Sequence, residues 1–242
     1  MTRRKTALVT GANKGIGREI ARRLAALDCT VWLGCREPGR GEEAAAALRG
    51  QGGDVRLLPL DVADSASVAR AAATLAGETD RLDILVNNAG VARDAGAAPS
   101  ALAIAAMQAT YEVNVFGPVR VTQALLPLLR AAPAARIVMV SGGLGSLALI
   151  SDANHPFYPF NMLAYNSSKS ALNAVTVAFA KELRDSPIKV NAADPGYTAT
   201  DLNRHRGTTS IAQGAEIAVR LALLPDDGPT GGFFNDEGRQ PW

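Results

Sequence analysis

The sequence contains few residues that form disulfides or bind metal ions, with only two cysteines and two histidines among 242 residues. Cys29 and Cys35 lie close together without a CxxC spacing or a Cys/His neighbour, so no disulfide framework is expected. We expect both thiols to stay reduced, which favours a cytoplasmic location. His155 and His205 have no ligand partners at suitable spacing, and we predict no metal site.

Net charge and long apolar runs are also lacking. Lys and Arg number 25 against 23 for Asp and Glu, and this balance gives no reason to expect a nucleic-acid partner. Long uncharged stretches such as residues 95–111 and 137–151 contain Gly, Pro or Ser and are shorter than the roughly 20 apolar residues of a membrane span. Residues 6–12 are too short for a signal peptide. With 48% hydrophobic residues the chain is expected to fold into a globular core.

Short β-branched runs alternate with alanine-rich helical stretches along the whole chain. This rhythm predicts an α/β fold with a doubly wound parallel sheet, in one domain over residues 1–242. The predicted strands are residues 6–10, 30–35, 55–60, 84–87, 136–140 and 189–193, with a seventh at 232–235. The predicted helices are residues 15–27, 41–49, 65–75, 111–129, 164–184 and 212–223, with Asp64 and Ser100 as N-caps.

A glycine-rich loop, T-G-A-N-K-G-I-G at residues 10–17, follows the first strand and opens the first helix. Glycines there allow a tight turn and a close approach to a pyrophosphate, and the helix N-terminus offers unpaired N–H groups to it. Ordinary turns also use glycine, but the position between a strand and a helix favours dinucleotide binding. The spacing G-x-x-x-G-x-G differs from the usual G-x-G-x-x-G fingerprint.

Four further segments fall in register with this loop: Asp61-Val62, N-N-A-G at residues 87–90, Tyr165-x-x-x-Lys169, and Pro195-Gly196. Together they make the chain resemble the short-chain dehydrogenase/reductase family over nearly its whole length. The resemblance implies a Rossmann-type fold. Gly34-Cys35-Arg36 and the tail at residues 228–234 are most similar to the NADPH-dependent carbonyl reductases of that family.

The pair Tyr165 and Lys169 has an i, i+4 spacing, which puts both side chains on one helix face. A neighbouring ammonium favours a phenolate, so the spacing predicts a lowered pKa for Tyr165, suited to proton exchange with a carbonyl or an alcohol. In the family such a lysine also bonds the nicotinamide ribose. Asn114 matches the family asparagine whose backbone holds a proton-relay water.

The fifth strand departs from the family pattern at its end. The resemblance places a catalytic serine at position 142, but the chain reads Ser141-Gly142-Gly143. We take Ser141 as the catalytic candidate, although successive strand residues point to opposite faces and a bulge or twist would be needed. Ser146 is another possible donor, and a gap at Gly142 with no hydroxyl is the third.

Two cations favour NADP(H) over NAD(H). Arg36 stands where NAD-preferring sites usually carry an acid, and Lys14 lies in the glycine loop, so both can pair with a 2′-phosphate; the alternative is that both face water. Glu37 weakens this preference. The residues that the resemblance places around the dinucleotide are Gly11, Asn13, Lys14, Gly15, Ile16, Gly17, Arg36, Asp61, Val62, Asn88, Tyr165, Lys169, Pro195, Gly196, Thr198 and Thr200.

Two loops, at about residues 142–164 and 198–211, are expected to border the substrate. The first is longer than in most members of the family and carries aromatic side chains, so it can wall the site for a hydrophobic carbonyl compound or pack as a satellite core. It can also obstruct the helix-pair interface of family tetramers. We therefore expect a monomer or a small homo-oligomer.

The function that these expectations favour is an NADPH-dependent oxidoreductase of the carbonyl reductase type, with Tyr165 as the general acid and base. The alternative is a nucleotide-binding protein of the same fold whose catalysis is weak or lost because of Gly142. A sugar-nucleotide epimerase shares the Tyr-x-x-x-Lys pair, but it normally needs a larger substrate domain than this chain has room for. Turnover of a small-molecule substrate separates the reductase from the nucleotide-binding protein. We expect neither a nucleic acid nor a membrane as a partner.

Overall fold

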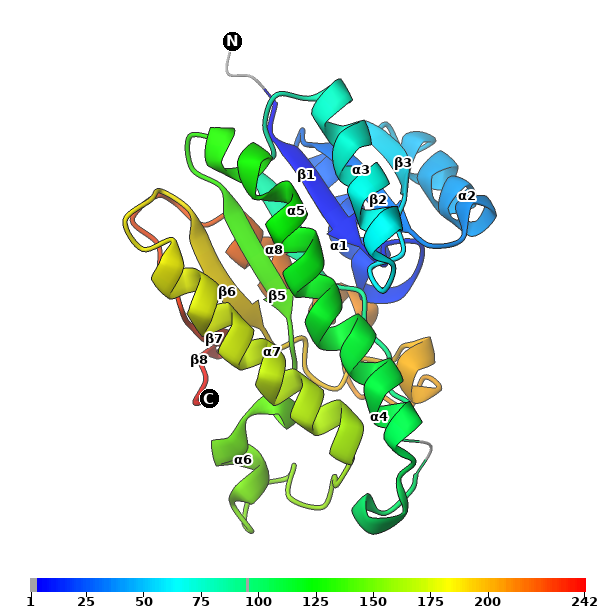
Figure 1. Ribbon diagram of the computed structural model, residues 1–242, viewed down its shortest axis with the longest axis vertical. Helices are drawn as coiled ribbons and strands as arrows, with labels where there is room; N and C mark the ends of the chain where they lie inside the picture. Colours follow the sequence, from blue (N-terminus) through cyan, green and yellow to red (C-terminus); the bar gives the residue numbers. More distant parts are fainter. Residues whose placement is uncertain (1–3, 95) are drawn as a thin grey trace.

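The computed structural model describes residues 4–94 and 96–242, and the strands within them form one eight-stranded sheet in the order β3-β2-β1-β4-β5-β6-β7-β8 (Figure 1). Strands β1 to β7 run parallel, and β8 is antiparallel to β7. The predicted α/β fold with a doubly wound parallel sheet is thereby confirmed. The strand order reverses its direction between β1 and β4, the point at which open α/β sheets bind ligands at the carboxyl ends of their strands.

The six principal strands form where the sequence predicts them. Their bounds are β1 Thr6–Thr10, β2 Thr30–Cys35, β3 Val55–Pro59, β4 Ile84–Asn87, β5 Arg136–Val140 and β6 Lys189–Ala193, followed by β7 Phe233–Asn235 and β8 Gly238–Arg239. Strand β3 ends one residue early, and the two-residue β8 was not predicted. So short a strand has no periodicity in the sequence; it forms because the turn after β7 returns the chain onto that strand.

The helices form close to their predicted positions, with corrections at several ends. Their bounds are α1 Gly15–Ala26, α2 Pro38–Arg49, α3 Ser65–Glu78, α4 Ile104–Tyr111, α5 Gly117–Ala131, α6 Leu147–Ser151, α7 Leu163–Glu182 and α8 Ile211–Ala222. Helix α2 begins three residues before its predicted start. Pro38 suits this first position because the first turn leaves backbone N–H groups without a partner and proline has none. The short helix α6 lies in the loop after β5 and was not predicted.

Two N-caps were predicted, and one is wrong. The Asp64 side chain accepts a hydrogen bond from the N–H of Ala66, as an N-cap does. Ser100 lies inside a short 3₁₀ turn, Pro99–Ala101, and α4 begins only at Ile104. The helix expected from residue 111 therefore starts seven residues earlier, and a π-helical turn, Glu112–Phe116, joins α4 to α5.

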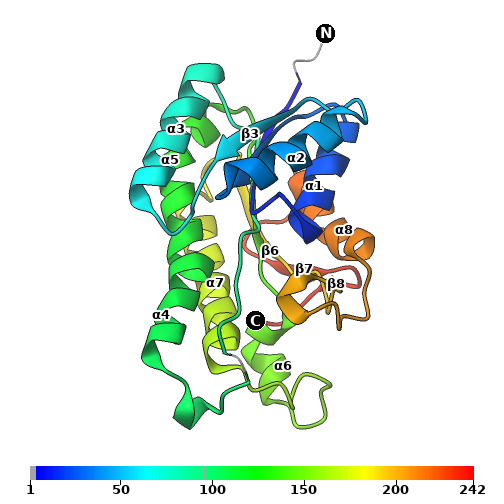
Figure 2. The same ribbon diagram turned by 90° about the vertical axis from the view of Figure 1, so that its right-hand side faces the viewer.

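Helices cover both faces of the sheet (Figures 1 and 2). On one face α1, α2 and α8 bury a core that includes Ile20, Leu48 and Ile217 against β1 and β2. On the other face α3, α5 and α7 bury a second core that includes Leu75 and Leu129. Because both faces are covered, the strands read as continuous apolar runs, and the loops at the carboxyl edge of the sheet are the parts free to form a site.

Cys29 and Cys35 are both buried free thiols, and burial raises the pKa of each. Within the described residues no helix is long and apolar enough to span a membrane. The same part of the chain contains no cluster of His, Cys, Asp or Glu that could hold a metal ion.

Candidate active site

The glycine loop forms a tight turn between β1 and α1. Gly11 and Gly15 have positive φ angles of 62° and 56°, a backbone region that side chains disfavour. A Cβ atom at Gly17 would collide with the side-chain amide of Asn88. That amide donates 2.8 Å and 3.3 Å hydrogen bonds to the carbonyl oxygens of Thr10 and Gly11. Through these two hydrogen bonds the Asn88 side chain fixes the conformation of the glycine loop.

The loop leaves the start of α1 available to an anion. Helix α1 begins at Gly15, and Lys14 precedes it without a side-chain cap, so the first N–H groups of the helix have no capping acceptor. Ile16 packs its side chain against the core and anchors the first turn. The glycines leave space for a ligand and the helix N-terminus offers unpaired N–H groups. This turn therefore fits the pyrophosphate of a dinucleotide.

A hollow of about 380 Å³ lies beside this helix start. Its lining residues are Asn13, Lys14, Arg18, Arg40, Glu43, Ala44 and Asp201. The Lys14 ammonium group is only 2.6 Å from a carboxylate oxygen of Asp201, and this contact lowers the pKa of that carboxyl. The expected partner Arg36 is not among the lining residues; it is exposed, with its guanidinium 3.6 Å from the carboxylate of Glu37. Arg18 and Arg40 were missed because each comes from a helix rather than from the motif itself.

Asp61 and Val62 follow β3 at the same edge of the sheet. An Asp61 carboxylate oxygen accepts a 3.0 Å hydrogen bond from the N–H of Ala63, which fixes the turn after the strand. Val62 is buried, and its Cγ2 atom lies 2.9 Å from the place of a Cβ on Gly117. The two residues thus connect the edge of the sheet with the start of α5.

Tyr165 and Lys169 lie on one face of α7, as the spacing predicts. The Lys169 Nζ atom is 5.7 Å from the centre of the Tyr165 ring and donates a 2.8 Å hydrogen bond to the carbonyl oxygen of Val140. A Cβ on Gly90 would lie 3.7 Å from Lys169 Nζ and 3.5 Å from Asn114 Oδ1. Lys169 and Asn114 therefore both lie beside Gly90, in the loop after β4.

Asn114 lies in the π-helical turn between α4 and α5 and is fully buried. Its side chain exchanges two 2.8 Å hydrogen bonds with the backbone of Val91 and donates one of 3.0 Å to Ser168 on α7. A π-turn shifts one carbonyl out of the regular helical ladder, and such turns are frequent at functional sites. The side chain thus fixes the turn between the loop after β4 and the helix that carries Tyr165.

The ionisation of the pair differs from the prediction. Burial and the charge of Asp194 raise the pKa of Tyr165 to about 12, so the expected lowering by Lys169 is wrong for this structure. Burial lowers the pKa of Lys169 to about 8. At neutral pH the phenol therefore holds its proton beside a charged ammonium, which is the arrangement of a proton donor.

The Ser141 hydroxyl does not reach Tyr165. It donates a 2.6 Å hydrogen bond to Oδ1 of Asn173 and lies on the side of β5 that faces α7, as the alternation of a strand requires. This corrects its expected place beside the substrate. Ser146 is fully buried and caps α6 by accepting a hydrogen bond from the N–H of Leu149. A Cβ on Gly142, in contrast, would lie 4.0 Å from the hydroxyl oxygen of Tyr165.

The loop after β6 brings Pro195, Gly196, Thr198 and Thr200 to the same edge. Gly196 has a φ of 68°, and the Thr198 hydroxyl donates a 2.8 Å hydrogen bond to the carbonyl oxygen of Pro195. The Thr200 methyl carbon is 3.7 Å from the place of a Cβ on Gly15. This loop and the glycine loop therefore face each other across the helix start of α1.

Two buried carboxyl groups near Tyr165 were missed in the sequence. Asp94 accepts hydrogen bonds from the backbone N–H groups of Ala164, at 2.8 Å, and Tyr165, at 3.1 Å, and so caps α7. Asp194 follows β6 and accepts a 2.9 Å hydrogen bond from the N–H of Gly196. A cap 70 positions away from its helix gives no local signal in the sequence.

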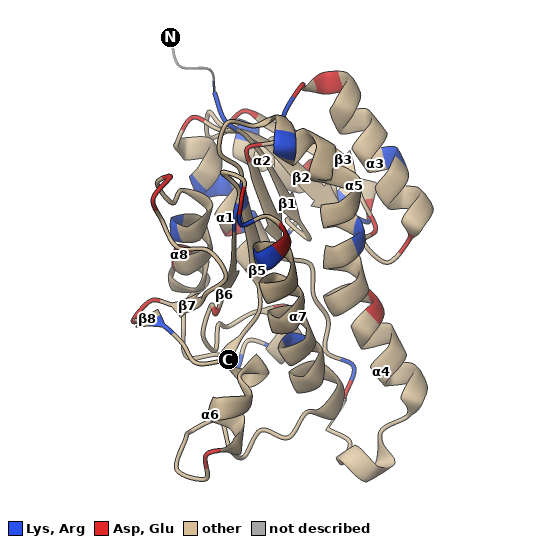
Figure 3. Ribbon diagram, turned by 60° about the vertical axis from the view of Figure 1, so that its left-hand side comes forward, with Lys and Arg blue, Asp and Glu red and all other residues tan. Residues whose placement is uncertain are grey.

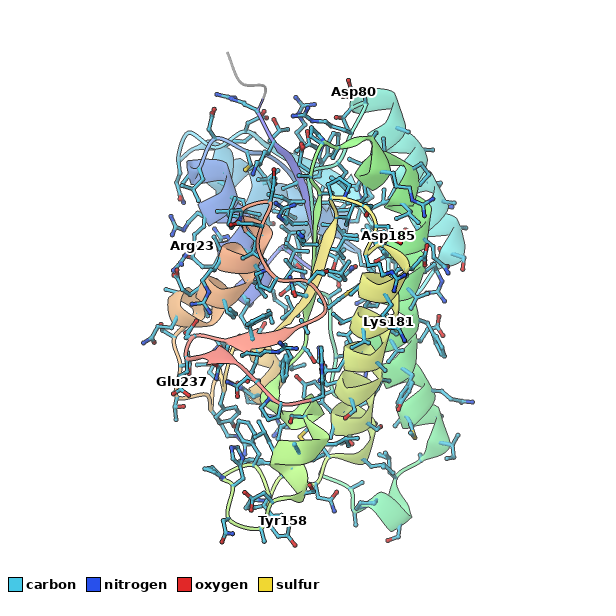
Figure 4. All side chains as sticks on the ribbon, turned by 90° about the vertical axis from the view of Figure 1, so that its left-hand side faces the viewer. Arg23, Asp80, Tyr158, Lys181, Asp185 and Glu237 are labelled. Atoms are coloured by element: carbon cyan, nitrogen blue, oxygen red, sulfur yellow. The ribbon has the colours of Figure 1, made fainter. Side chains whose placement is uncertain are left out.

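Aromatic side chains of the first predicted substrate loop contact Gly143 and lie close to Tyr197, which directly precedes the second loop. The Phe157 ring covers Gly143, where a Cβ would collide with it. The ring centres of Phe160 and Tyr197 are 6.4 Å apart, and both side chains are exposed. Tyr158 lies at the tip of the first loop, beyond α6 (Figure 4). Phe157 packs against Gly143 as in a satellite core, whereas Phe160 and Tyr197 are exposed as in a site wall, so the loop has features of both alternatives.

Charge is sparse in the first loop but not in the second, where Asp201, Arg204 and Arg206 are exposed. Residues 142–164 contain one formally charged residue, Asp152, and Figure 3 shows the ribbon around α6 almost free of charged positions. An apolar surface of this kind fits an apolar small molecule better than a charged one.

Comparison with known proteins agrees with this geometry. The family model for short chain dehydrogenases matches residues 5–210. (-)-Isopiperitenone reductase from Mentha piperita is 36% identical over 300 aligned positions, covering 94% of this chain and 95% of that protein. Carbonyl reductase [NADPH] 1 from Rattus norvegicus is 33% identical and covers 99% of each chain. The crystal structure of NADPH-bound carbonyl reductase from chicken fatty liver superposes with a TM-score of 0.86 at 29% identity, covering 99% of this chain and 100% of that one.

The sheet, the glycine loop and the helix-borne Tyr165 and Lys169 define an oxidoreductase fold that binds a nicotinamide dinucleotide. The chain belongs to the short-chain dehydrogenase family, whose members act on carbonyl and alcohol groups.

Proposed function

We propose that this protein is an NADPH-dependent carbonyl reductase in which Tyr165 protonates the substrate oxygen. The observation that carries the proposal is the convergence of Tyr165, Lys169 and Asn114 at one edge of the sheet, beside the glycine loop. The names of its relatives, a carbonyl reductase and an isopiperitenone reductase among them, support the same reaction class.

The preference for NADPH rests on the cations beside the start of α1. Lys14, Arg18 and Arg40 line one hollow, and three cations suit the 2′-phosphate that distinguishes NADPH from NADH. Arg36 lies outside the lining and joins them only if its exposed side chain turns toward the phosphate. Bound along this edge, NADPH supplies the hydride that reduces the carbonyl carbon.

The proton comes from this chain. Tyr165 is protonated at neutral pH because its pKa is about 12, so it can donate to an oxygen that gains negative charge. Lys169, charged below its pKa of about 8, stabilises the phenolate that remains after donation. We propose that the Asn114 backbone holds the water that returns a proton by way of Lys169.

The proposed substrate is a small, largely apolar ketone or aldehyde. Loop 142–164 carries the exposed ring of Phe160, whose centre lies 6.4 Å from that of the exposed Tyr197, the residue directly before loop 198–211. Apolar walls around a few polar groups are typical of sites for small hydrophobic molecules. The same protein is expected to oxidise the corresponding secondary alcohol when NADP⁺ is supplied.

The test is oxidation of NADPH and of NADH with a panel of aryl ketones, cyclic ketones, aldehydes and quinones, together with the reverse reaction. Turnover with NADPH, faster for bulky apolar carbonyl compounds than for small polar ones, supports the proposal. Tight NADPH binding without turnover on any member favours the alternative, a nucleotide-binding protein that has lost catalysis at Gly142.

A further inference from the structure

The segment between α6 and α7, residues 152–162, brings the exposed ring of Phe160 back to the helix that carries Tyr165 (Figure 1). It contains neither helix nor strand, but it is folded into successive turns. Backbone N–H groups donate to carbonyl oxygens three positions earlier, at 2.9 Å from residue 155 and at 3.0 Å from residues 158 and 160. The segment therefore has a defined shape, and side chains fix it to the rest of the molecule.

Two side-chain contacts attach these turns to the site. The Phe157 ring packs over Gly143, at the end of β5. At the other end, the Nδ2 group of Asn166 donates a 2.7 Å hydrogen bond to the carbonyl oxygen of Phe160. Asn166 directly follows Tyr165 on α7 and is only 7% exposed. The backbone of Phe160 is thus bound to the helix that carries the proposed proton donor.

The oxygen of the Asn166 amide has no comparable role. This atom, Oδ1, is buried and accepts no hydrogen bond from the part of the chain that the structure describes. A buried acceptor without a partner costs free energy, so an aliphatic residue of similar shape would suit this position of α7 at least as well. The bond to Phe160 is the contact that requires the amide.

The ring that this bond places lies beside a second ring from another loop. The centres of Phe160 and Tyr197 are 6.4 Å apart, and their planes are inclined by 49°. Tyr197 is held by its own loop, since its carbonyl oxygen accepts a 3.0 Å hydrogen bond from the N–H of Thr209. The spacing between the two rings therefore depends on where the backbone of Phe160 is held.

We propose that Asn166 is a specificity-determining positioning residue, which holds the Phe160 ring beside Tyr197 and so favours bulky apolar ketones over small carbonyl compounds. Asn166 acts through Phe160 and does not touch the substrate itself. A wall that is already ordered binds a bulky substrate more tightly than one that must be ordered on binding. A small aldehyde does not extend to this wall. The inference rests on the proposed carbonyl reductase function and concerns its substrate class.

The first test is Asn166→Leu in the full chain, with NADPH as the reductant. Leucine has the branched shape of asparagine without its donor. KM for a bulky aryl ketone is expected to rise about fivefold, equivalent to about 1 kcal/mol, the net value of a neutral hydrogen bond. For a small aldehyde kcat and KM are expected to stay within about twofold of the wild type. Asn154→Leu, the same change at an exposed asparagine of the same loop, is the control.

A double-mutant cycle separates positioning from a general structural role. Because Asn166 acts through Phe160, adding Asn166→Leu to Phe160→Ser is expected to raise KM for the aryl ketone no further than Phe160→Ser does alone. A residue that only stabilises the fold would add its own effect to that of Phe160→Ser. Asn166→Ala, which creates no steric demand, is measured in the same cycle and is expected to give the same result.

Hydrogen–deuterium exchange tests the bond without any substrate. Loss of the Asn166 donor is expected to loosen the turns, so the peptide that covers residues 152–160 takes up deuterium faster in Asn166→Leu than in the wild type. Peptides of α4 are expected to exchange at the same rate in both proteins. This measurement reports on the loop whether or not a ketone is reduced.

Several results would overturn the role of Asn166. They are an unchanged KM for the aryl ketone in both variants, additive effects in the cycle, unchanged exchange of residues 152–160, and a failure of both variants to fold, which would show that Asn166 serves stability. An equal loss of kcat for both substrates would mean that it acts on Tyr165 instead. All of these leave the carbonyl reductase function standing. A wild type that reduces no carbonyl compound overturns that function and the role in specificity together.

Discussion

The ammonium group of Lys169 donates a 2.8 Å hydrogen bond to the carbonyl oxygen of Val140, the last residue of β5. This bond joins α7 to the centre of the sheet and places a charged group where it is only 4% exposed. The lysine is therefore held in place before any substrate binds. Burial of its charge has a free-energy cost to the folded state, and this cost depends on pH.

That cost gives a prediction for stability. The pKa of Lys169 falls from 10.5 to about 8, so below pH 8 the folded state carries a penalty of roughly 3 kcal/mol that it loses as pH rises to 10.5. Lys169→Met is expected to be more stable than the wild type by an amount that is largest below pH 8 and shrinks toward pH 10.5. Urea unfolding across this range measures it, and Lys181→Met, on the exposed face of α7, is the control. A difference independent of pH contradicts the prediction.

The second prediction concerns the proton. Tyr165→Phe removes the transferable proton and keeps the ring, so it is expected to abolish measurable ketone reduction while changing NADPH affinity by less than about threefold. Turnover and NADPH fluorescence titration give the two values. Tyr158→Phe, at the exposed loop tip, is expected to behave as the wild type. Turnover of Tyr165→Phe within about tenfold of the wild type means that the acid is another group.

The third prediction concerns cofactor choice. NADPH is expected to bind at least about tenfold more tightly than NADH, equivalent to about 1.4 kcal/mol. Arg40→Ala is expected to reduce this ratio, and Asp201→Asn to increase it, because the amide releases Lys14 from its ion pair. Arg70→Ala, on α3, is the charge-matched control. Equal dissociation constants for the two dinucleotides in the wild type refute the preference.

The fourth prediction separates stability from catalysis at Ser141. Ser141→Ala leaves Oδ1 of the buried Asn173 without its donor, and the expected loss of unfolding free energy is about 1–3 kcal/mol. The kcat value is expected to stay within about threefold of the wild type, since the hydroxyl points away from Tyr165. Chemical denaturation and steady-state kinetics measure both quantities, with the exposed Ser151→Ala as control. A large loss of kcat at full stability implies that Ser141 reaches the substrate.

The fifth prediction concerns the mouth of the site. Phe160→Ser removes one of two rings whose centres lie 6.4 Å apart. It is expected to raise KM several-fold for bulky aryl ketones and to leave KM for a small aldehyde unchanged, because only a large substrate reaches the ring. Equal changes for both substrates show that the loop acts on folding or on cofactor binding instead.

Features that depend on neighbours in the chain could be predicted from the sequence. The glycine loop, the Tyr165–Lys169 face and the six principal strands follow from local spacing and periodicity, and the structure has all of them. The departure at Gly142 could be read from one segment in the same way, and the structure places this glycine beside Tyr165.

Features that depend on distant segments of the chain could not be predicted from the sequence. Asp94 caps a helix far along the chain, and Asp194 reaches the glycines after β5 only because β5 and β6 pair in the sheet. The raised pKa of Tyr165 has the same origin, since burial and Asp194 outweigh the effect expected from the adjacent lysine. Periodicity predicts which face a side chain occupies, but it does not predict which groups from other strands meet it there.

The contact of the Phe157 ring with Gly143 also constrains how this protein can change over generations. A side chain at position 143 would collide with the far edge of the ring as it lies here, so the ring must turn away or be lost before a larger residue fits. Descendants of this sequence that keep the ring packed in this place are therefore expected to keep glycine at 143.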